Sequence, residues 1–355
     1  MKEDIKSINR EPLIDWLASH HVRAFRADQI LKWVYMRLAD SFDQMSDISK
    51  NLRSLLVQHF CIARLPVQEL QTAEDGTRKY LFALADGNRI ETVLIPERNH
   101  YTLCVSSQVG CAQGCQFCVT GRGGLVRNLT AAEIISQVWE VRKLIPDPER
   151  LTNLVFMGMG EPLANYDNLV AAIEALTSTQ WGMKIANRRV TVSTAGLVPR
   201  ISDLGRDTKV NLAVSLNAVD DDTRSRLMPI NRKYPIQALV AACRQYPLPK
   251  GRRITVEYIL FKDLNDSVDQ ARKLARLLAP VKAKINLIPF NPYPGSPFRR
   301  PGERTIAAFQ EVLLAKHLTS VVRYSKGQDI MAACGQLRAG GHPASIGGYR
   351  PDPGF

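Results

Sequence analysis

The 355-residue sequence has no apolar run long enough to cross a bilayer, and no basic segment followed by an apolar one at its start. From these two absences we expect neither a membrane-spanning helix nor a secretory leader, and therefore a cytoplasmic protein without membrane contact. Internal repeats and long low-complexity segments are also absent, which is typical of a globular chain. At this length the chain suits one large α/β domain with a smaller appendage.

The sequence has fewer acidic than basic residues. Lys and Arg number 47 against 34 Asp and Glu, which gives a net charge of +13 and a pI near 9.5. Such an excess favours a polyanionic partner, most simply RNA or DNA, through neutralisation of phosphates. The alternative is that the charge serves only solubility.

The seven cysteines do not form a disulfide framework, and three of them lie within eight residues, at Cys111, Cys115 and Cys118. A [4Fe–4S] cluster normally takes four thiolates, and these eight residues supply only three. The spacing therefore predicts a cluster with one iron open to a ligand. A structural zinc site is the alternative, but no second Cys or His couple completes one.

The chain begins with helical patterns and then changes. Residues 9–60 read as helices with two apolar faces, separated by a basic stretch at 20–26. One face holds Leu13, Trp16 and Leu17, and the other holds Phe25, Ile30, Leu31, Val34, Tyr35 and Leu38. This helical part, 1–75, is predicted to be an accessory domain, either an RNA-contact module or a cap. Residues 76–100 are predicted to be a β-hairpin linker that turns at Asp86-Gly87.

From residue 101 to 337 the pattern is β/α alternation. Strands are expected near 101–107, 151–157, 189–194, 210–217, 253–260, 284–290 and 320–324. Helices are expected near 131–145, 166–178, 197–205, 235–245, 267–278 and 303–316, the first with a capping box at Thr130 and Glu133. Six βα units are too few for a closed eight-stranded barrel, so we predict an open, partial (β/α)6 barrel, with a doubly wound sheet as the alternative. Residues 338–355 are predicted to be a flexible tail.

Small or polar residues follow five of these strands. Besides the cysteine loop they are 158–162, 193–196, 215–217 and 291–295. Active sites of parallel β/α folds lie at the carboxyl ends of the strands, so these segments should converge on one cavity.

The cysteine spacing resembles that of radical S-adenosylmethionine (radical-SAM) enzymes. Further segments (104–111, 153–162, 227–231, 285–292 and 333–337) resemble the radical-SAM RNA methyltransferases that methylate an adenine ring carbon. The resemblance implies a [4Fe–4S] cluster and S-adenosylmethionine as cofactors. It also implies that carbon 2 of an adenine is methylated in 23S rRNA, at the peptidyl-transferase centre, and in tRNA, 3′ of the anticodon.

The resemblance also implies roles for three residues outside the cluster. Cys334 matches a cysteine that is first methylated and then joined covalently to RNA, and Cys104 matches the cysteine that resolves this adduct. Glu91 matches a proposed proton acceptor, although whether Glu91 or Cys104 removes the ring hydrogen stays open. By periodicity alone, each would be an ordinary strand or turn residue.

Cofactor contacts are implied for a further set of residues. Gly160 and Glu161 should approach the methionyl amino group. Contacts with the ribose, carboxylate or adenine of S-adenosylmethionine are implied for Ser193, Ser215, Leu216, Asn217 and Asn291. Many members of the family have His at position 217, and Asn cannot titrate near neutral pH.

Phosphate contacts are predicted for basic residues in loops: Arg122, Arg127, Lys184, Arg188, Arg189, Arg232, Lys233, Arg299, Arg300 and Arg304. Flavodoxin as electron donor and a monomeric state follow from family analogy. Two alternatives stay open: a carbon-8 methyltransferase of the antibiotic-resistance type, disfavoured by Val109, and an iron–sulfur electron carrier or a non-enzymatic RNA-binding protein.

Overall fold

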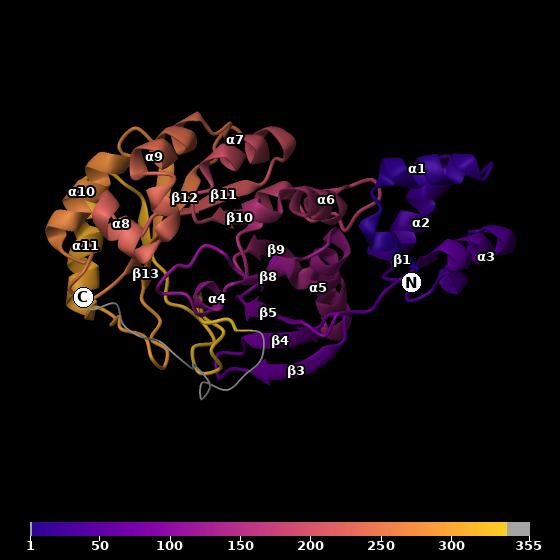
Figure 1. Ribbon diagram of the computed structural model, residues 1–355, viewed down its shortest axis with the longest axis horizontal. Coiled ribbons are helices and arrows are strands. Elements are labelled where there is room, and N and C mark those ends of the chain that lie inside the picture. Colours follow the sequence, from indigo (N-terminus) through magenta and orange to yellow (C-terminus); the bar gives the residue numbers. More distant parts are fainter. Residues whose placement is uncertain (1, 339–355) are drawn as a thin grey trace.

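A computed structural model describes residues 2–338. The chain begins with three helices that stand apart at one end of the molecule: α1 (Arg10–Ser19), α2 (Phe25–Tyr35) and α3 (Lys50–His59) (Figure 1). Two short strands, β1 (Glu3–Asp4) and β2 (Phe60–Cys61), pair in parallel and close this region. Most of the predicted apolar faces are buried, but the prediction is wrong at Phe25, which is 48% exposed at the start of α2.

A ten-stranded sheet forms the rest of the molecule. In spatial order its strands are β14 (Ser320–Val322), β13 (Ala283–Pro289), β12 (Ile254–Leu260), β11 (Asn211–Ser215), β10 (Val190–Thr194), β9 (Leu151–Phe156), β6 (Tyr101–Cys104), β5 (Arg89–Pro96), β4 (Arg78–Ala83) and β3 (Val67–Thr72). The strands from β14 to β6 are parallel, whereas β5, β4 and β3 continue the sheet in antiparallel pairing. All seven parallel strands coincide with predicted ones.

Helices follow the parallel strands and surround the sheet (Figure 1). The six predicted helices are confirmed as α5 (Ala131–Leu144), α6 (Tyr166–Thr177), α7 (Val198–Asp207), α9 (Ile236–Gln245), α10 (Val268–Leu278) and α11 (Glu303–Ala315). The capping box of α5 forms as predicted, with Thr130 and Glu133 each accepting the other's backbone N–H. Two shorter helices, α4 (Val119–Arg122) and α8 (Asp221–Leu227), and a second, two-stranded sheet of β7 (Gln108–Gly110) and β8 (Leu125–Asn128) were not predicted.

Short 3-10 helices complete the described elements. They are η1 (Ile5–Ser7), η2 (Phe42–Gln44), η3 (Pro148–Arg150), η4 (Pro162–Asn165), η5 (Asn187–Arg189) and η6 (Pro229–Arg232).

The outer face of the sheet is apolar. Directly paired strand residues project to the same face, and the register of β6 to β13 collects there Leu103, Leu154, Phe156, Val192, Leu212, Val214, Val256, Tyr258, Ile285 and Leu287. Each is at most 3% exposed. Helices pack directly on this face of the sheet. For example, the ring centroid of Tyr258 lies 5.5 Å from that of Phe309 on α11. Burial of such side chains stabilises the fold by roughly 1.5–3 kcal/mol apiece.

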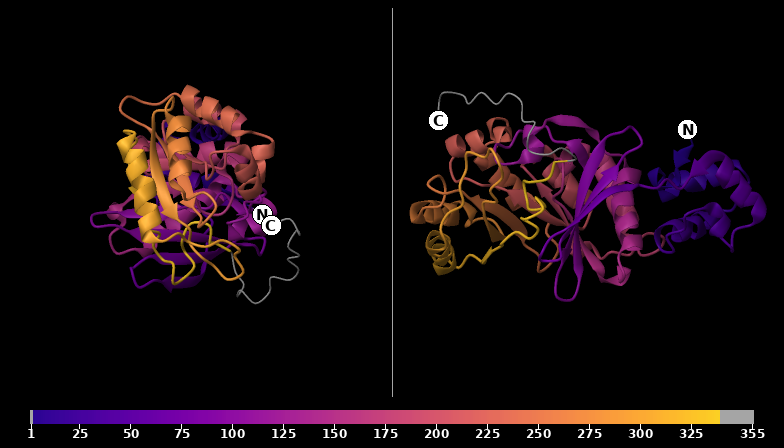
Figure 2. Two further views of the ribbon diagram at one scale, coloured as in Figure 1. Left: turned by 90° about the vertical axis from the view of Figure 1, so that its left-hand side faces the viewer. Right: turned by 90° about the horizontal axis from the view of Figure 1, so that it is seen from below.

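The sheet does not close. Its edge strands β3 and β14 do not pair within residues 2–338, and the chain after β14 crosses the gap between them instead. Asp75 accepts the backbone N–H of Gly327 at 2.9 Å, and Asp329 accepts that of Glu74 at 3.1 Å. The predicted open, partial barrel is therefore confirmed, with a coil in place of the missing strands (Figure 2).

The central sheet begins earlier in the chain than the predicted domain boundaries. Strand β3 starts at Val67, within the range predicted to be the helical domain, and the hairpin β4–β5 is part of the sheet rather than a separate linker. This topology favours a boundary just before Val67, although the division into domains stays a prediction. The predicted tail, apart from Arg338, lies outside the described residues. None of the helices within 2–338 has the length and apolar character needed to cross a membrane.

Candidate active site

One face of the sheet lines the inside of the partial barrel, and this inner face is polar. The register pairs Cys104 with Val155 across β6 and β9, and Ser215 with Glu257 across β11 and β12. Side chains repeat on one face at every second residue. The inner face therefore carries Glu91, Cys104, Ser193, Ser215, Glu257 and Asn286. Four of these were predicted to be site residues, and the pairing brings them together.

The cysteine loop lies between β7 and α4. Its conformation depends on Gly110, whose φ is +76° and whose missing Cβ would lie 2.0 Å from the carbonyl oxygen of Gly124. No other residue fits there, because a left-handed φ and a backbone contact coincide. Cys111 donates its backbone N–H to that same Gly124 oxygen at 2.8 Å, which fixes the first cysteine of the loop.

The three thiols form one electrostatic group. Burial raises the pKa of each thiol. With the added effect of Cys118 the pKa of Cys111 reaches about 12, and Cys118 and Cys111 both raise the pKa of Cys115. All three are free cysteines. Buried thiols of this kind stay protonated unless a metal holds them as thiolates.

A cubane cluster fits this donor set better than a single metal ion does. Within residues 2–338, no three His, Cys, Asp or Glu side chains are arranged to hold one ion. In a cubane each thiolate binds a different iron, so the sulfurs do not need to converge on one point. The triplet therefore suits a [4Fe–4S] cluster with one iron left for another ligand, and the zinc alternative loses its support.

The segment after β14 places Cys334 beside the cysteine loop. The carbonyl oxygen of Gly335 accepts the backbone N–H of Val119 at 2.7 Å, and that of Leu337 accepts the Thr120 hydroxyl at 2.6 Å. Gly335 has a φ of +84°. On the other side of the segment, Lys79 of β4 donates to the carbonyl oxygen of Ile330 at 2.7 Å. Residues 330–337 are thus held between the cysteine loop and the hairpin.

Cys334 lies near the inner face of the sheet, since its thiol is close to Glu257 and Cys104. It is exposed while its neighbours Ala333 and Gln336 are buried, yet the surrounding walls desolvate the thiol and raise its pKa to about 11. The negative charge of Glu257 raises this pKa further and Arg323 lowers it.

Cys104 lies at the end of β6 and is buried. Burial raises the pKa of its thiol well above the ordinary range, and proximity to Cys334 raises it further. The two cysteines predicted to act together, which are 230 positions apart in the sequence, are therefore electrostatic neighbours in the fold.

Glu91 is fixed on the same inner face by two contacts. Its carboxylate lies 3.2 Å from the Lys79 ammonium, and its other oxygen accepts the backbone N–H of Arg338 at 2.6 Å. The side chain is 6% exposed. It thus holds together the hairpin and the segment that carries Cys334.

Gly160 and Glu161 follow β9. Gly160 has a φ of +104°, and a Cβ there would lie 2.6 Å from the Gln108 side chain, so packing alone requires a glycine. Glu161 is buried and accepts backbone N–H groups of Ala195 and Leu163 at 2.7 and 3.1 Å. Burial raises the pKa of its carboxyl to about 7. The carboxyl joins the ends of β9 and β10 and is close enough to influence Cys111 and Cys115.

The remaining cofactor candidates differ in how free their side chains are. Ser193 and Ser215 are half-buried on the inner face, and Leu216 is buried behind it. Asn217 is fully buried at a φ of +60°, and it accepts the N–H of Ile259 at 2.8 Å while its amide lies 3.2 Å from the sulfur of Met228. Its side chain is thus occupied within the protein, and its predicted ligand contact has no support in these bonds.

Asn291 has a side-chain oxygen that is free to accept a hydrogen bond from a ligand. Its amide donates to the Ser325 hydroxyl at 2.9 Å and to the carbonyl oxygen of Cys334 at 3.2 Å. Its Oδ1 is buried and has no hydrogen-bond partner. A buried acceptor without a donor is costly, so this oxygen suits a ligand that donates a hydrogen bond, such as the adenine of S-adenosylmethionine.

Two buried groups of the site were not predicted. Arg224 of α8 is fully buried and donates to the carbonyl oxygens of Ala195, Ser215 and Leu216 at 2.7, 3.0 and 3.0 Å, which joins the ends of β10 and β11. Glu257 accepts from the Asn286 amide at 2.9 Å, and burial raises its pKa. The only signal for Glu257 in the sequence is a charge inside the apolar run 254–260.

Several of the predicted phosphate-binding residues are ion-paired. Arg127 lies 2.5 Å from Asp86 and 2.8 Å from Glu133, while Arg299 and Arg300 pair with Asp263 and Glu303. Arg232, Lys233 and Arg304 are exposed without an ion pair among the described residues.

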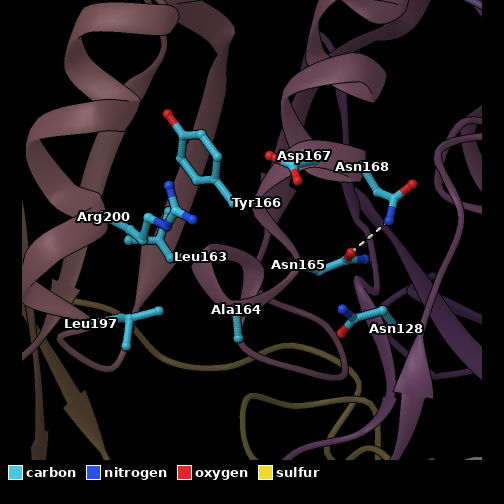
Figure 3. A pocket seen from close by; sticks show the side chains of 9 residues that line it. All are labelled: Asn128, Leu163, Ala164, Asn165, Tyr166, Asp167, Asn168, Leu197 and Arg200. Atoms are coloured by element: carbon cyan, nitrogen blue, oxygen red, sulfur yellow. Dashed lines mark hydrogen bonds between the residues drawn. The ribbon is translucent and has the colours of Figure 1, made fainter.

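A separate cavity of about 270 Å³ lies at the N-terminal ends of α6 and α7 (Figure 3). Its polar side chains satisfy one another in part, as Asn168 donates to Asn165 at 2.8 Å. None of the predicted site residues lines it. It lies behind the Glu161 loop and is not the predicted active site.

Comparison with known proteins places this site in a family. Residues 4–62 match the ribosomal RNA large subunit methyltransferase N-terminal domain, and residues 105–275 match the radical SAM superfamily. The dual-specificity RNA methyltransferase RlmN of Desulfosudis oleivorans is 53% identical over 96% of this chain and 91% of its own length. That of Geobacter sulfurreducens is 51% identical over 94% of this chain and 92% of its own length. The chain belongs to the RlmN family.

A solved structure agrees with this assignment. A radical SAM methyltransferase from Sphaerobacter thermophilus matches with a TM-score of 0.89 and 46% identity, over 95% of this chain and all of that one. The protein is thus a radical-SAM RNA methyltransferase of the RlmN family, whose cofactors are a [4Fe–4S] cluster and S-adenosylmethionine. The family match confirms the predicted enzyme class and excludes the electron carrier and the non-enzymatic binder. It supports the main hypothesis and not the carbon-8 alternative.

Proposed function

We propose that the protein methylates carbon 2 of an adenine in 23S rRNA and in tRNA, with Cys334 as the methyl carrier and Cys104 as the resolving residue. The observation that carries this proposal is the placement of the two cysteines. Cys334 is close enough to Cys104 to raise the pKa of its thiol, and the residue after Cys334 is bonded to the cysteine loop, because the Gly335 carbonyl oxygen accepts the backbone N–H of Val119. Val109 supports carbon 2 over carbon 8, because the carbon-8 relatives have cysteine there and this chain has a buried valine.

The cluster on Cys111, Cys115 and Cys118, together with S-adenosylmethionine, supplies the methyl group and the radical chemistry. The chain's own residues hold the reactants. Glu161 and Gly160 orient the methionyl end of the cofactor, Ser193, Ser215 and Leu216 line its other groups, and Asn291 accepts a hydrogen bond through its free oxygen. Asn217 holds the end of β11 against β12 through its side chain.

In the second half-reaction the carbon that Cys334 carries is bonded to the adenine ring. Cys104 as a thiolate attacks the Cys334 sulfur, so that the sulfur–carbon bond breaks while a disulfide forms. The electron pair of the broken bond passes to the nucleotide, which gains a proton at the new methyl group and loses one from carbon 2. Glu91 is the proposed acceptor of the ring proton, with Cys104 as the other candidate. An external electron donor, flavodoxin by analogy, reduces the cluster, and we expect a cytoplasmic monomer.

The test is a Cys104→Ala variant. Without the resolving thiol, the enzyme should accumulate a covalent RNA–protein adduct, visible as a band shift that ribonuclease removes. Cys243→Ala is the matched control, since Cys243 is also buried with a raised pKa but lies on α9 in the apolar core. Free, fully methylated RNA from Cys104→Ala would overturn the scheme. Mass spectrometry of the nucleosides after chromatography separates the 2-methyl from the 8-methyl isomer.

A further inference from the structure

The opposite end of the barrel, where the parallel strands begin, carries a concentration of positive charge. Five segments lie where β10, β11, β12, β13 and β14 begin: residues 178–189, 208–210, 246–253, 279–284 and 316–319, the fourth of which includes the first two residues of β13. They contain ten Lys and Arg residues and no Asp or Glu. This set, here named the basic rim, is Lys184, Arg188, Arg189, Lys209, Lys250, Arg252, Arg253, Lys282, Lys284 and Lys316. All but the half-buried Arg252 are exposed.

Hydrogen bonds between the segments show that the basic rim is continuous. Asn211 donates to the carbonyl oxygen of Arg188 at 2.8 Å, and Arg252 donates to that of Lys209. Arg253 then reaches the Thr319 hydroxyl at 2.7 Å. Since neighbouring strands lie about 4.8 Å apart, five of them spread the rim over roughly 20 Å.

The charge of the basic rim is not neutralised by ion pairs among the described residues, although Lys284 is close enough to Glu257 to lower the pKa of that carboxyl. None of its ten side chains forms an ion pair with a described residue, whereas Arg10, Arg64, Arg127 and Lys79 elsewhere are paired. Uncompensated like charges at such spacing raise the positive potential at the surface and attract polyanions.

The composition of the rim points to a phosphate backbone rather than to a protein. No large hydrophobic side chain is exposed in the five segments, so the aromatic anchors that protein interfaces use are absent from them. Lys and Arg on loops are the usual contacts to phosphates, which position a nucleic acid without reading its sequence.

Most of the rim also lies far from the catalytic residues, although Lys284 is on the same face of β13 as Asn286, which bonds Glu257. The seven residues of β12 separate the two edges of the sheet by about 20 Å, at roughly 3.3 Å per residue. An electron donor bound there would be remote from the cysteine loop, whereas an RNA extends far beyond its target base. The first rim segment reaches the N-terminal helices, because Gln180 donates to Asp28 at 2.8 Å and the rings of Trp181 and Tyr35 lie 5.8 Å apart.

We propose that the basic rim binds the phosphate backbone of RNA outside the target stem-loop, as a second contact surface remote from the catalytic edge. This inference rests on the proposed RNA substrate and adds where that RNA is held. The rim increases affinity for long RNA and leaves the chemistry at Cys334 unchanged.

The test compares two triple variants of the cluster-loaded enzyme. The rim variant is Arg188→Gln/Arg189→Gln/Arg253→Gln, and the control is Arg272→Gln/Lys273→Gln/Arg276→Gln on the exposed side of α10. The affinity of each variant is measured for two RNA probes. One is a transcript of the rRNA domain that contains the target adenine, and the other is the minimal stem-loop alone. Thermal unfolding checks that both variants are folded.

For the rim variant, the Kd for the long transcript should rise at least about tenfold, and the slope of log K against log salt should fall by about 2–3. The Kd for the stem-loop and its maximal methylation rate should not change, and the control should match the wild type for both probes. Equal affinity of wild type and rim variant for the long transcript would overturn the proposal. An equal loss of affinity for both RNA probes would also overturn it. So would a variant that binds both probes normally but is reduced more slowly by an acidic flavodoxin. Failure of the proposed function would look different, because the wild type would then methylate neither probe.

Discussion

The two faces of the central sheet are built from alternate residues of the same strands, yet they have opposite characters. In β12, Val256 and Tyr258 project outward and are at most 3% exposed among helix side chains, whereas Thr255 and Glu257 project inward. The outer face is mostly apolar, and the inner face carries two carboxylates, a thiol, two hydroxyls and an amide. Stability and chemistry are thus separated by a single-residue step along each strand, and a change on one face should leave the property of the other largely intact.

The largest expected effect on the inner face is from Cys334→Ala. The variant loses the sulfur that would carry the methyl group, so RNA methylation should fall below about one thousandth of the wild-type rate. Because Cys334 is exposed, the midpoint of thermal unfolding should stay close to that of the wild type. Nucleoside mass spectrometry measures the first quantity and calorimetry the second. Methylation at the wild-type rate would show that Cys334 does not carry the methyl group.

Glu91→Gln should give a smaller loss on the same face. The amide keeps the shape of the carboxyl but cannot accept a proton, so the rate should fall by about 10²-fold, the lower end of what a general base contributes. Glu69→Gln on the exposed strand β3 is the control. The readout is the single-turnover rate of methylation. An unchanged rate would assign the ring proton to Cys104 and leave Glu91 with its structural contacts to Lys79 and Arg338.

Leu154→Ala tests the outer face. Leu154 is fully buried on β9, so the truncation should lower the free energy of unfolding by about 2–5 kcal/mol, from lost burial and from the cavity left behind. Methylation per folded molecule should be unchanged at a temperature where the variant is folded. Chemical denaturation gives the first value, and active-site-normalised turnover the second. A large loss of turnover without a loss of stability would contradict the division between the two faces.

The sequence alone was sufficient for elements whose periodicity is strong. The seven parallel strands and six covering helices were predicted because apolar runs of strand length alternate with amphipathic runs of helix length. Strand β3 was missed because Val67–Thr72 is an edge strand with mostly polar, exposed residues, and only its pairing with β4 identifies it.

The site was predictable to the extent that it depends on motifs. The triplet and the strand-end residues were found in this way, but Arg224 and Glu257 were not, because their importance comes from burial and from partners distant in the chain. The sequence also did not show that the side chain of Asn217, a predicted cofactor contact, is bonded within the protein. Its bond to the Ile259 backbone depends on the register of β11 against β12, which no local pattern indicates.

The smallest expected effect is a change in the reactivity of Cys334 toward iodoacetamide. The pKa of this thiol is raised to about 11, so at pH 8 it is mostly protonated, and its alkylation rate should rise about tenfold per pH unit until pH approaches 11. Glu257 raises this pKa and Arg323 lowers it. Glu257→Gln should therefore increase the thiolate fraction and speed alkylation at pH 8, and Arg323→Gln should slow it, each by less than about tenfold, the factor that one pKa unit gives. Peptide mass spectrometry of Cys334, with the half-buried Cys61 of the N-terminal region as internal reference, measures both rates. Equal rates in the two variants would mean that the charges of the inner face do not act on the methyl-carrying thiol. The inner face would then position reacting groups without changing their pKa.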